Sequence, residues 1–244
     1  MALAGFGDRV EGLHAVAAAA AAGRVAQLWV ERGRLQRPEF QSVVDDVVAS
    51  SGTVSAVDDV ISLAETSAPQ GLVARCVPRI EASLDQLATG VAPAAVMVLD
   101  HVVDPHNLGA IARSIAAAGL SGLVLASRRA APLSAAAFKA AAGALEIVAV
   151  TRVSSIAEAL GRLRRLGLWS IGLDQGAEQV LWGLPLLGEP LALVVGDEGT
   201  GLSRLVAERV EVRVRIPIAP SVESLNASVA AALAAFEVSR VRGL

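Results

Sequence analysis

The stretch from Gly196 to Ser228 contains two polar loops, each of which follows an apolar segment of strand length. The first loop reads Gly196-Asp197-Glu198-Gly199-Thr200-Gly201-Leu202, and the second reads Ile216-Pro217-Ile218-Ala219-Pro220-Ser221-Val222-Glu223-Ser224-Leu225-Asn226-Ala227-Ser228. Glycines in the first loop permit positive φ and close approach of a ligand. Prolines hold the backbone of the second loop stiff. The stretch therefore predicts two loops that present main-chain N–H and C=O groups to a ligand.

Upstream of these loops, short apolar segments alternate with helical segments. The expected strands are residues 95–99, 122–126, 147–150, 168–172, 191–195 and 212–216. Continuous apolar strands that alternate with helices are typical of a parallel sheet covered on both faces. Ligands bind such sheets at the carboxyl ends of the strands, where both polar loops begin.

The first part of the chain has the same alternation on a smaller scale. We expect helices at residues 12–22, 38–50 and 58–63, and strands at residues 25–30, 53–56 and 71–76. The prolines Pro78 and Pro93 frame a polar connection between the two parts. The sequence thus predicts an α/β domain at residues 1–76, a linker at 77–93 and a larger α/β domain at 94–244.

Composition limits the classes of function. The chain has 244 residues, 54% of them hydrophobic, and a formal net charge of −3. No apolar run reaches the roughly 20 residues that cross a bilayer, so we expect no membrane segment. The single cysteine, Cys76, cannot form an internal disulfide, which favours the cytoplasm. The absence of a basic block argues against a large nonspecific nucleic-acid surface.

The loop after the strand at 95–99 leads into a helix with the sequence Asn107-Leu108-Gly109-Ala110-Ile111-Ala112-Arg113. Asn107 is predicted to be the N-cap of this helix. The same loop holds two histidines and two aspartates, but the chain has no second cluster of ligands, so we predict no metal site.

Together these motifs resemble those of the SpoU/TrmH group of SPOUT RNA ribose 2′-O-methyltransferases. The family pattern reads roughly N-x-G-x-x-x-R, then G-x-E-G-x-G, then I-P-M-x-x-x-x-x-S-L-N-x-S, and all three motifs occur here in that order. The resemblance extends over nearly the whole chain. It departs from the pattern at Ile218, Pro220 and Glu223, which bears on the substrate more than on the chemistry.

The resemblance implies a SPOUT-type parallel sheet with a C-terminal trefoil knot, preceded by a small L7Ae/L30e-like α/β domain that binds the RNA substrate. It also implies S-adenosylmethionine-dependent methylation of a ribose 2′-hydroxyl, most of all in a guanosine of 23S rRNA, by a homodimer. The residues that it places in catalysis are Asn107, Arg113, Glu198 and Asn226. Those that it places around the cofactor are Gly196, Gly201, Ile216, Ser224 and Leu225.

A guanidinium hardly gives up its proton, so we interpret Arg113 as a clamp on the target phosphate and not as a base. In the dimer that the resemblance implies, Arg113 acts on the partner's cofactor. The final helix, expected at residues 224–240, has an apolar face that a second subunit would cover.

Candidate RNA contacts in the first domain are Arg32 and Arg34, and those in the second are Arg128, Arg129 and Lys139. The same side chains could equally be solvated surface. The departures from the family pattern leave open a tRNA substrate or an antibiotic-resistance role, and a non-catalytic RNA-binding or assembly factor with the same fold is a further alternative.

Overall fold

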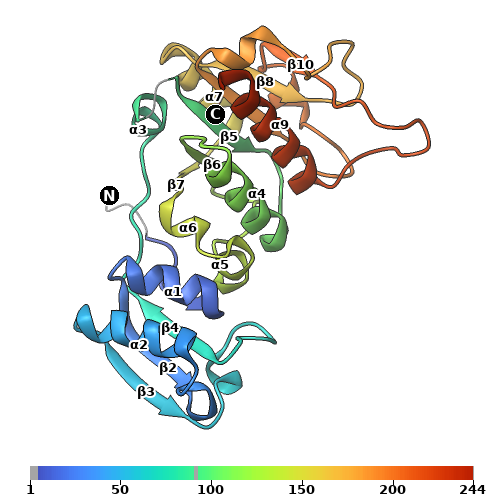
Figure 1. Cartoon of the computed structure of the whole chain (residues 1–244). Coiled ribbons are helices and arrows are strands. Elements are labelled where there is room, and N and C mark those ends of the chain that lie inside the picture. Colours follow the sequence, from blue (N-terminus) through green and yellow to red (C-terminus); the bar gives the residue numbers. More distant parts are fainter. Residues whose placement is uncertain (1–4, 91–92, 244) are drawn as a thin grey trace. The chain divides into compact units, whose positions relative to one another are not determined.

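The computed structural model describes residues 5–90 and 93–243. Met1–Ala4, Leu244, and Val91 and Ala92 of the expected linker lie outside the described residues. Contacts divide the chain into two compact units. The first unit runs to Glu81 and includes Pro132–Ile147, and the second comprises Ala82–Ala131 and the chain from Val148 onward. Figure 1 shows the elements in chain order.

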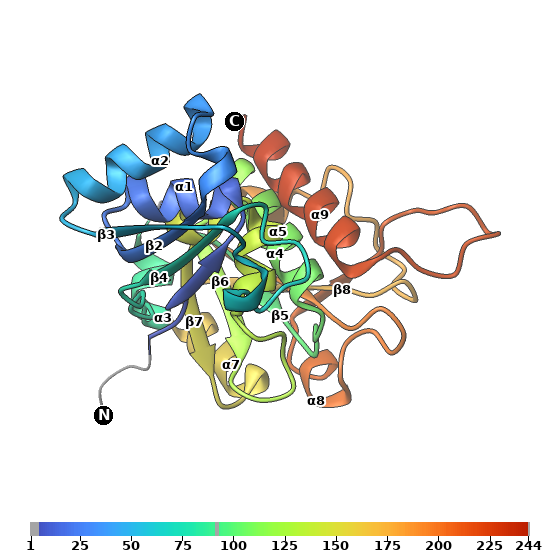
Figure 2. The same cartoon turned by 90° about the horizontal axis from the view of Figure 1, so that it is seen from below.

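The first unit is a four-stranded sheet in the order β1-β4-β2-β3. Its elements are β1 (Arg9–Glu11), α1 (Leu13–Ala21), β2 (Val25–Glu31), η1 (Arg32–Arg34), α2 (Pro38–Ala49), β3 (Thr53–Val57), η2 (Ile61–Leu63), β4 (Leu72–Cys76), α5 (Ala135–Ala141) and α6 (Ala144–Ile147). Helices α1 and α2 pack together and lie against the strands of this sheet (Figure 2). The helix expected at 58–63 is only the short 3-10 turn η2, because the Asp59 carboxylate binds the Ile61 N–H and holds a turn.

Residues 132–147 were expected in the second domain, but their contacts group them with the first unit. The ring of Phe138 on α5 lies 6.2 Å from that of Phe6. Glu146 accepts 2.8 and 2.5 Å hydrogen bonds from Arg24, and the Glu146 side chain is only 3% exposed. An aromatic contact and a buried ion pair therefore fix this segment to the first unit. Strand and helix order alone does not reveal such long-range contacts.

The second unit is a six-stranded sheet in the order β10-β8-β9-β5-β6-β7, and every pair of neighbouring strands is parallel. Its elements are α3 (Leu84–Thr89), β5 (Ala95–Leu99), α4 (Pro105–Ala117), β6 (Gly122–Ala126), β7 (Ala149–Val153), α7 (Ile156–Arg165), β8 (Trp169–Leu173), η3 (Pro185–Gly188), β9 (Leu191–Val195), α8 (Arg204–Ala207), β10 (Val212–Val214) and α9 (Ala227–Arg242). The central strands β5 and β9 are buried along their whole length, as expected for a sheet covered on both faces. The predicted α/β class with a parallel sheet is confirmed.

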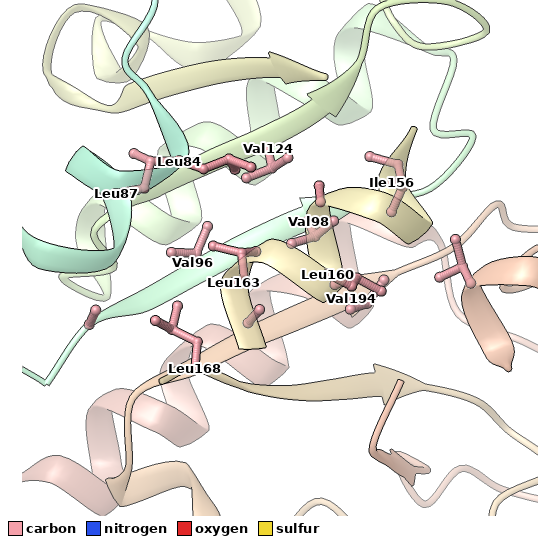
Figure 3. Close-up of a cluster of buried hydrophobic side chains, with 14 residues drawn as sticks. Leu84, Leu87, Val96, Val98, Val124, Ile156, Leu160, Leu163, Leu168 and Val194 are labelled. Carbon is pink, nitrogen blue, oxygen red and sulfur yellow. The ribbon is translucent and has the colours of Figure 1, made fainter. Parts of the chain in front are cut away.

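Figure 3 shows the core on one face of this sheet, where Leu84 and Leu87 of α3 pack with side chains of β5, β6, α7 and β9. Ser83 begins α3 with a capping box that also involves Gln86. The expected linker at 77–93 therefore contains a packed helix. The sequence interpretation missed it because the helix has only 6 residues, fewer than a periodic pattern needs.

Helix α9 begins at Ala227, three residues after Ser224, since Asn226 caps it. Its buried face consists mainly of small residues, among them Ala231, Ala234 and Ala235, and α9 makes extensive contact with α4. The opposite stripe of Val229, Leu233 and Phe236 is 46%, 38% and 50% exposed. The larger apolar residues of α9 thus face outward, while alanines allow close helix packing. No helix among the described residues has the length and apolar character needed to cross a membrane.

Candidate functional site

A cleft of 440 Å³ opens at the carboxyl ends of β8, β9 and β10. Two continuous stretches, Leu173–Gln175 and Val195–Leu202, form part of its lining. The rest comes from separate positions later in the chain: Ala207, Ile216, Glu223–Leu225, Ala227 and Ala230. All five residues expected around the cofactor line it, namely Gly196, Gly201, Ile216, Ser224 and Leu225. The structure therefore brings the two loops of the opening motif together around one hollow.

The loop after β9 is held closed by its own backbone and by Asp197. The main chains of Asp197 and Gly201 exchange hydrogen bonds of 3.1 and 2.9 Å. The Asp197 carboxylate accepts from the N–H groups of Gly199 and Thr200 at 3.1 and 3.3 Å. These bonds, the one from Gly199 foremost, hold the pKa of Asp197 below its usual value. The sequence interpretation missed this role, although an aspartate two residues before a glycine, as Asp197 is before Gly199, is a typical signal for an Asx-turn.

Residue 196 must be glycine because the backbone of Gly201 and Leu202 passes close to it. A Cβ atom built at this position would lie 2.2 Å from the carbonyl carbon and oxygen of Gly201 and 2.6 Å from the nitrogen of Leu202. Any side chain at residue 196 would therefore push the loop open.

A second hollow, of 260 Å³, lies beside the first. It is lined by Val102, Val103, Asp104, Asn107, Asp197, Glu198, Asn226 and Ala227. Three of these residues, Asp197, Glu198 and Ala227, also line the first cleft. The two hollows thus meet at the polypeptide around Glu198.

Glu198 is the centre of a hydrogen-bonded cluster drawn from three distant parts of the chain. Its Oε1 accepts from Nδ2 of Asn107 at 2.7 Å and from Nδ2 of Asn226 at 2.5 Å. The main-chain N–H of Ala227 donates to the same oxygen at 3.3 Å. Three of the four residues expected in catalysis therefore form one cluster at the boundary between the hollows.

Both asparagines lie at helix starts, but only one is a cap. Asn226 caps α9, and its Oδ1 accepts from the N–H groups of Ser228 and Val229 and from the Ser228 hydroxyl. The prediction that Asn107 caps α4 is wrong, because Asp104 is the N-cap and accepts from the N–H of His106 at 2.9 Å. With Pro105 as the first helical residue, Asn107 falls in the first turn and its side chain is available to Glu198.

Arg113, the fourth expected catalytic residue, lies outside this cluster. It is exposed on α4, six residues beyond Asn107 and therefore about 9 Å farther along the helix axis. Within residues 5–90 and 93–243 it has no hydrogen-bond or ion-pair partner. No described residue therefore holds the guanidinium in place.

Asp100 fixes the loop after β5. It is 2% exposed, and its two oxygens contact Nδ1 of His101 and the N–H of Ser203, each at 2.7 Å. Asp100 thus ties the loop that leads to Asn107 to the end of the loop that carries Glu198. Among the described residues no three histidine, cysteine or acidic side chains are grouped so as to hold a metal ion.

The expected RNA contacts are scattered. In the first unit, Arg32 pairs with Asp58 and Arg34 with Glu31, so neither guanidinium is free. Lys139 also belongs to the first unit, where its Nζ donates to the carbonyl oxygen of Ala68. Arg128 and Arg129 are exposed in the second unit, after β6. The expected group of Arg128, Arg129 and Lys139 is therefore divided between the two units.

Comparisons with known proteins agree with these motifs. The model of the SpoU rRNA Methylase family matches residues 94–236, and that of RNA 2′-O ribose methyltransferase substrate binding matches residues 9–82. The 23S rRNA (guanosine-2′-O-)-methyltransferase RlmB of Photobacterium profundum is 35% identical over 245 residues, which cover 96% of this chain and 98% of the relative. An uncharacterised tRNA/rRNA methyltransferase of Synechocystis is 34% identical over 97% of this chain, which spans only 63% of that relative.

Among solved structures, the SpoU methyltransferase AviRb of Streptomyces viridochromogenes, in complex with AdoMet, has a TM-score of 0.81 to this chain. It is 26% identical, and the match covers 96% of this chain and 89% of AviRb. The resemblance that the three motifs carried is confirmed over both parts of the sequence. The chain belongs to the SpoU rRNA methylase family.

Proposed function

We propose that this protein is a homodimeric methyltransferase that transfers the methyl group of S-adenosylmethionine to a guanosine ribose 2′-hydroxyl in 23S rRNA. The observation that carries the proposal is the meeting of two hollows at the Asn107–Glu198–Asn226 cluster. The activity for which the Photobacterium relative is named supports the substrate, and the AdoMet in the AviRb structure supports the donor. The single free cysteine, Cys76, is in keeping with the cytoplasm.

The first cleft suits S-adenosylmethionine in size and in lining. Its 440 Å³ falls in the range of ordinary ligand sites. Ile216 and Leu225 offer apolar surface for an adenine ring, while the loops after β9 and β10 offer main-chain groups. The close approach at Gly196 leaves no room for a side chain at this point of the loop after β9. When bound, S-adenosylmethionine would supply a methyl group activated by its sulfonium sulfur. The 2′-oxygen would accept this methyl group, S-adenosylhomocysteine would be the leaving group, and the hydroxyl proton would pass to water.

The second hollow then receives the ribose. Glu198 uses Oε1 to hold Asn107, Asn226 and Ala227, and its Oε2 has no hydrogen-bond partner in the described part of the chain. In the proposal, Oε2 accepts the hydrogen bond of the 2′-hydroxyl and orients its oxygen toward the first cleft. Orientation of this kind supplies much of the rate acceleration when the donor is already activated.

A second subunit completes the site. The apolar stripe of Val229, Leu233 and Phe236 runs along α9, directly after the cap at Asn226. Burial of such a stripe against a second copy favours a symmetric dimer. Arg113, which no described residue of its own subunit holds, would then clamp the target phosphate beside the partner's cleft. The knot that the resemblance implies around residues 196–228 stays a prediction.

The test is transfer of tritiated methyl groups from S-adenosylmethionine to unmodified transcripts of 23S rRNA and of tRNA. We expect label in 23S rRNA, in a dinucleotide that resists alkaline hydrolysis because its 2′-oxygen is methylated. Label in tRNA alone would reassign the substrate. Binding of RNA without any label would contradict an enzyme and favour an assembly factor.

A further inference from the structure

One face of the sheet in the first unit carries polar and aromatic side chains. On the other face Val10, Leu28 and Ala74 are buried, and α1 and α2 contact this sheet. Strand register pairs Arg9 with Arg75 and Arg75 with Gln27, and it pairs Val73 with Trp29. Because side chains alternate along a strand, Arg9, Arg75 and Trp29 share the opposite face, together with Val73, which is buried.

On this face lies a small hollow of 160 Å³, lined by Asp8, Arg9, Trp29, Glu65 and Arg75. It belongs entirely to the first unit. One indole, two guanidinium groups and two carboxylates therefore surround a space that suits a single planar base.

A buried carboxylate anchors the loop that carries Glu65, one of the residues that line the hollow. Glu11, which is 0% exposed, accepts 2.5 and 3.1 Å hydrogen bonds from the N–H groups of Glu65 and Thr66 and a 2.6 Å bond from the Thr66 hydroxyl. Arg9 holds the turn just before this loop, since its Nη2 donates to the carbonyl oxygen of Leu63 at 2.7 Å. These contacts fix Glu65 beside the strands before any ligand arrives.

Two charged groups at the hollow remain without partners. The side chains of Arg75 and Asp8 are exposed, and neither forms a hydrogen bond or an ion pair within the ranges that the structure describes. Arg32 and Arg34, by contrast, are paired with acidic side chains. Arg75 and Asp8 thus offer an unpaired donor and an unpaired acceptor at the hollow that Trp29 also lines.

We propose that this hollow binds one unpaired guanine of the RNA substrate, a contact separate from the methylated ribose and resting on the proposed function. The base stacks on Trp29, as unpaired bases do on aromatic side chains. Guanine presents neighbouring N1–H and N2–H donors that a carboxylate accepts, and O6 and N7 acceptors that a guanidinium binds. The hollow holds both kinds of group, whereas its two carboxylates disfavour a bare phosphate.

The experiment measures the affinity of the full chain, without cofactor, for fluorescein-labelled octauridine that carries one central guanosine. Matched probes carry adenosine or inosine there, and inosine lacks only the 2-amino group. We expect the guanosine probe to bind at least about fivefold more tightly than the adenosine probe, given the discrimination of a bidentate base contact. Trp29→Ala is expected to weaken the guanosine probe at least about fivefold, from the loss of one stacked base.

Three further variants separate this contact from folding and from general RNA affinity. Trp29→Phe keeps a stacking ring and should retain most of the affinity. Arg75→Gln changes an exposed, unpaired side chain and should reduce the preference for guanosine without loss of folding. Trp169→Ala removes another Trp, 45% exposed and in the second unit, and should leave binding unchanged.

Methyl transfer then distinguishes this inference from the proposed function. Trp29→Ala should raise KM for RNA and leave kcat nearly unchanged, because the hollow does not touch the reacting ribose. If Trp29→Ala and Arg75→Gln both bind the probes like wild type, the guanine site is overturned even when methyl transfer is intact. If Trp29 supports guanosine binding but the wild-type chain methylates no RNA, the guanine site stands and the proposed function fails.

Discussion

The side-chain amide of Asn226 donates from Nδ2 to Oδ1 of Asn107 over 3.0 Å, although 119 residues separate the two in the sequence. Both amides also donate to Oε1 of Glu198. The first turn of α4, the loop after β9 and the cap of α9 are thereby fixed to one another. The site is therefore a junction of a helix turn, a loop and a helix cap.

Asn226 has two separable tasks, which two substitutions distinguish. Asn226→Ala removes the cap of α9 and should lower the free energy of unfolding by about 1 kcal/mol, with loss of turnover. Asn226→Ser retains a good cap but loses the Nδ2 donor to Asn107 and Glu198, so stability should change little while turnover falls about 100-fold from misplacement. Denaturant unfolding and methyl transfer measure the two effects. Near-normal turnover of Asn226→Ser would remove the amide from the mechanism.

Gly196→Ala should abolish cofactor binding, because the added Cβ would lie 2.2 Å from the backbone of Gly201 and force the loop open. Gly199→Ala is the matched control in the same loop, since its Cβ would meet only Asp197 Oδ2 at an ordinary 3.5 Å. Calorimetric titration with S-adenosylmethionine compares the two. Equal affinities in both variants would place the cofactor away from this loop.

The Asp197 carboxylate predicts the pH dependence of the loop. Hydrogen bonds from Gly199 and Thr200 hold its pKa below 3.8 in the folded state. Because the pKa of Asp197 is lower in the folded state than in the unfolded state, its carboxylate stabilises the folded loop above pH 3.8. This stabilisation is lost as the pH falls through the pKa of the folded state. Cofactor affinity should therefore hold at neutral pH and drop in this acid range, while Asp197→Asn should bind more weakly at neutral pH and lack that drop. An identical acid profile in the variant would assign the loss to another group.

Phe236→Lys should convert the dimer to a monomer, because a charge at the 50% exposed Phe236 would be desolvated in the interface. In the monomer this side chain is already half exposed, so the free energy of unfolding at low protein concentration should change far less than the association. Sedimentation equilibrium measures the association. Val48→Lys, at a residue 59% exposed on α2, is the control and should stay dimeric. A wild-type chain that sediments as a monomer would contradict the proposed assembly.

Arg113→Ala should abolish turnover and leave cofactor binding intact, since Arg113 lies outside both hollows. If Arg113 acts on the partner's site, a mixture of Arg113→Ala and Gly196→Ala subunits should recover about a quarter of wild-type turnover. After random exchange of subunits, half of the dimers are heterodimers, and one of the two sites in each heterodimer is complete. Recovery would be absent if each subunit used its own Arg113.

Much of the second unit could be predicted from sequence, because its buried strands are continuous apolar runs that end in recognisable loops. The strands at 95–99, 122–126 and 191–195 match β5, β6 and β9. The strand expected at 147–150 is displaced to Ala149–Val153, because α6 continues to Ile147. Local pattern does not decide between two apolar elements that share a boundary.

The structural features that the sequence did not predict depend mostly on contacts between residues far apart in the chain. The grouping of residues 132–147 with the first unit rests on Phe6–Phe138 and Arg24–Glu146. The cap of α4 was assigned to Asn107, although Asp104 before Pro105 is the stronger start signal. The Asp100–Ser203 bond spans 103 residues, and no spacing rule predicts it.

The central claim is that Glu198 marks the boundary between methyl donor and ribose. A crystal structure with S-adenosylhomocysteine and a guanosine-containing RNA fragment tests it most directly, through the positions of the sulfur and the 2′-oxygen. We expect the sulfur in the cleft between Gly196–Leu202 and Glu223–Leu225, with the 2′-oxygen within hydrogen-bond reach of the Glu198 carboxylate. A cofactor bound elsewhere, or a 2′-oxygen remote from Glu198, would contradict it.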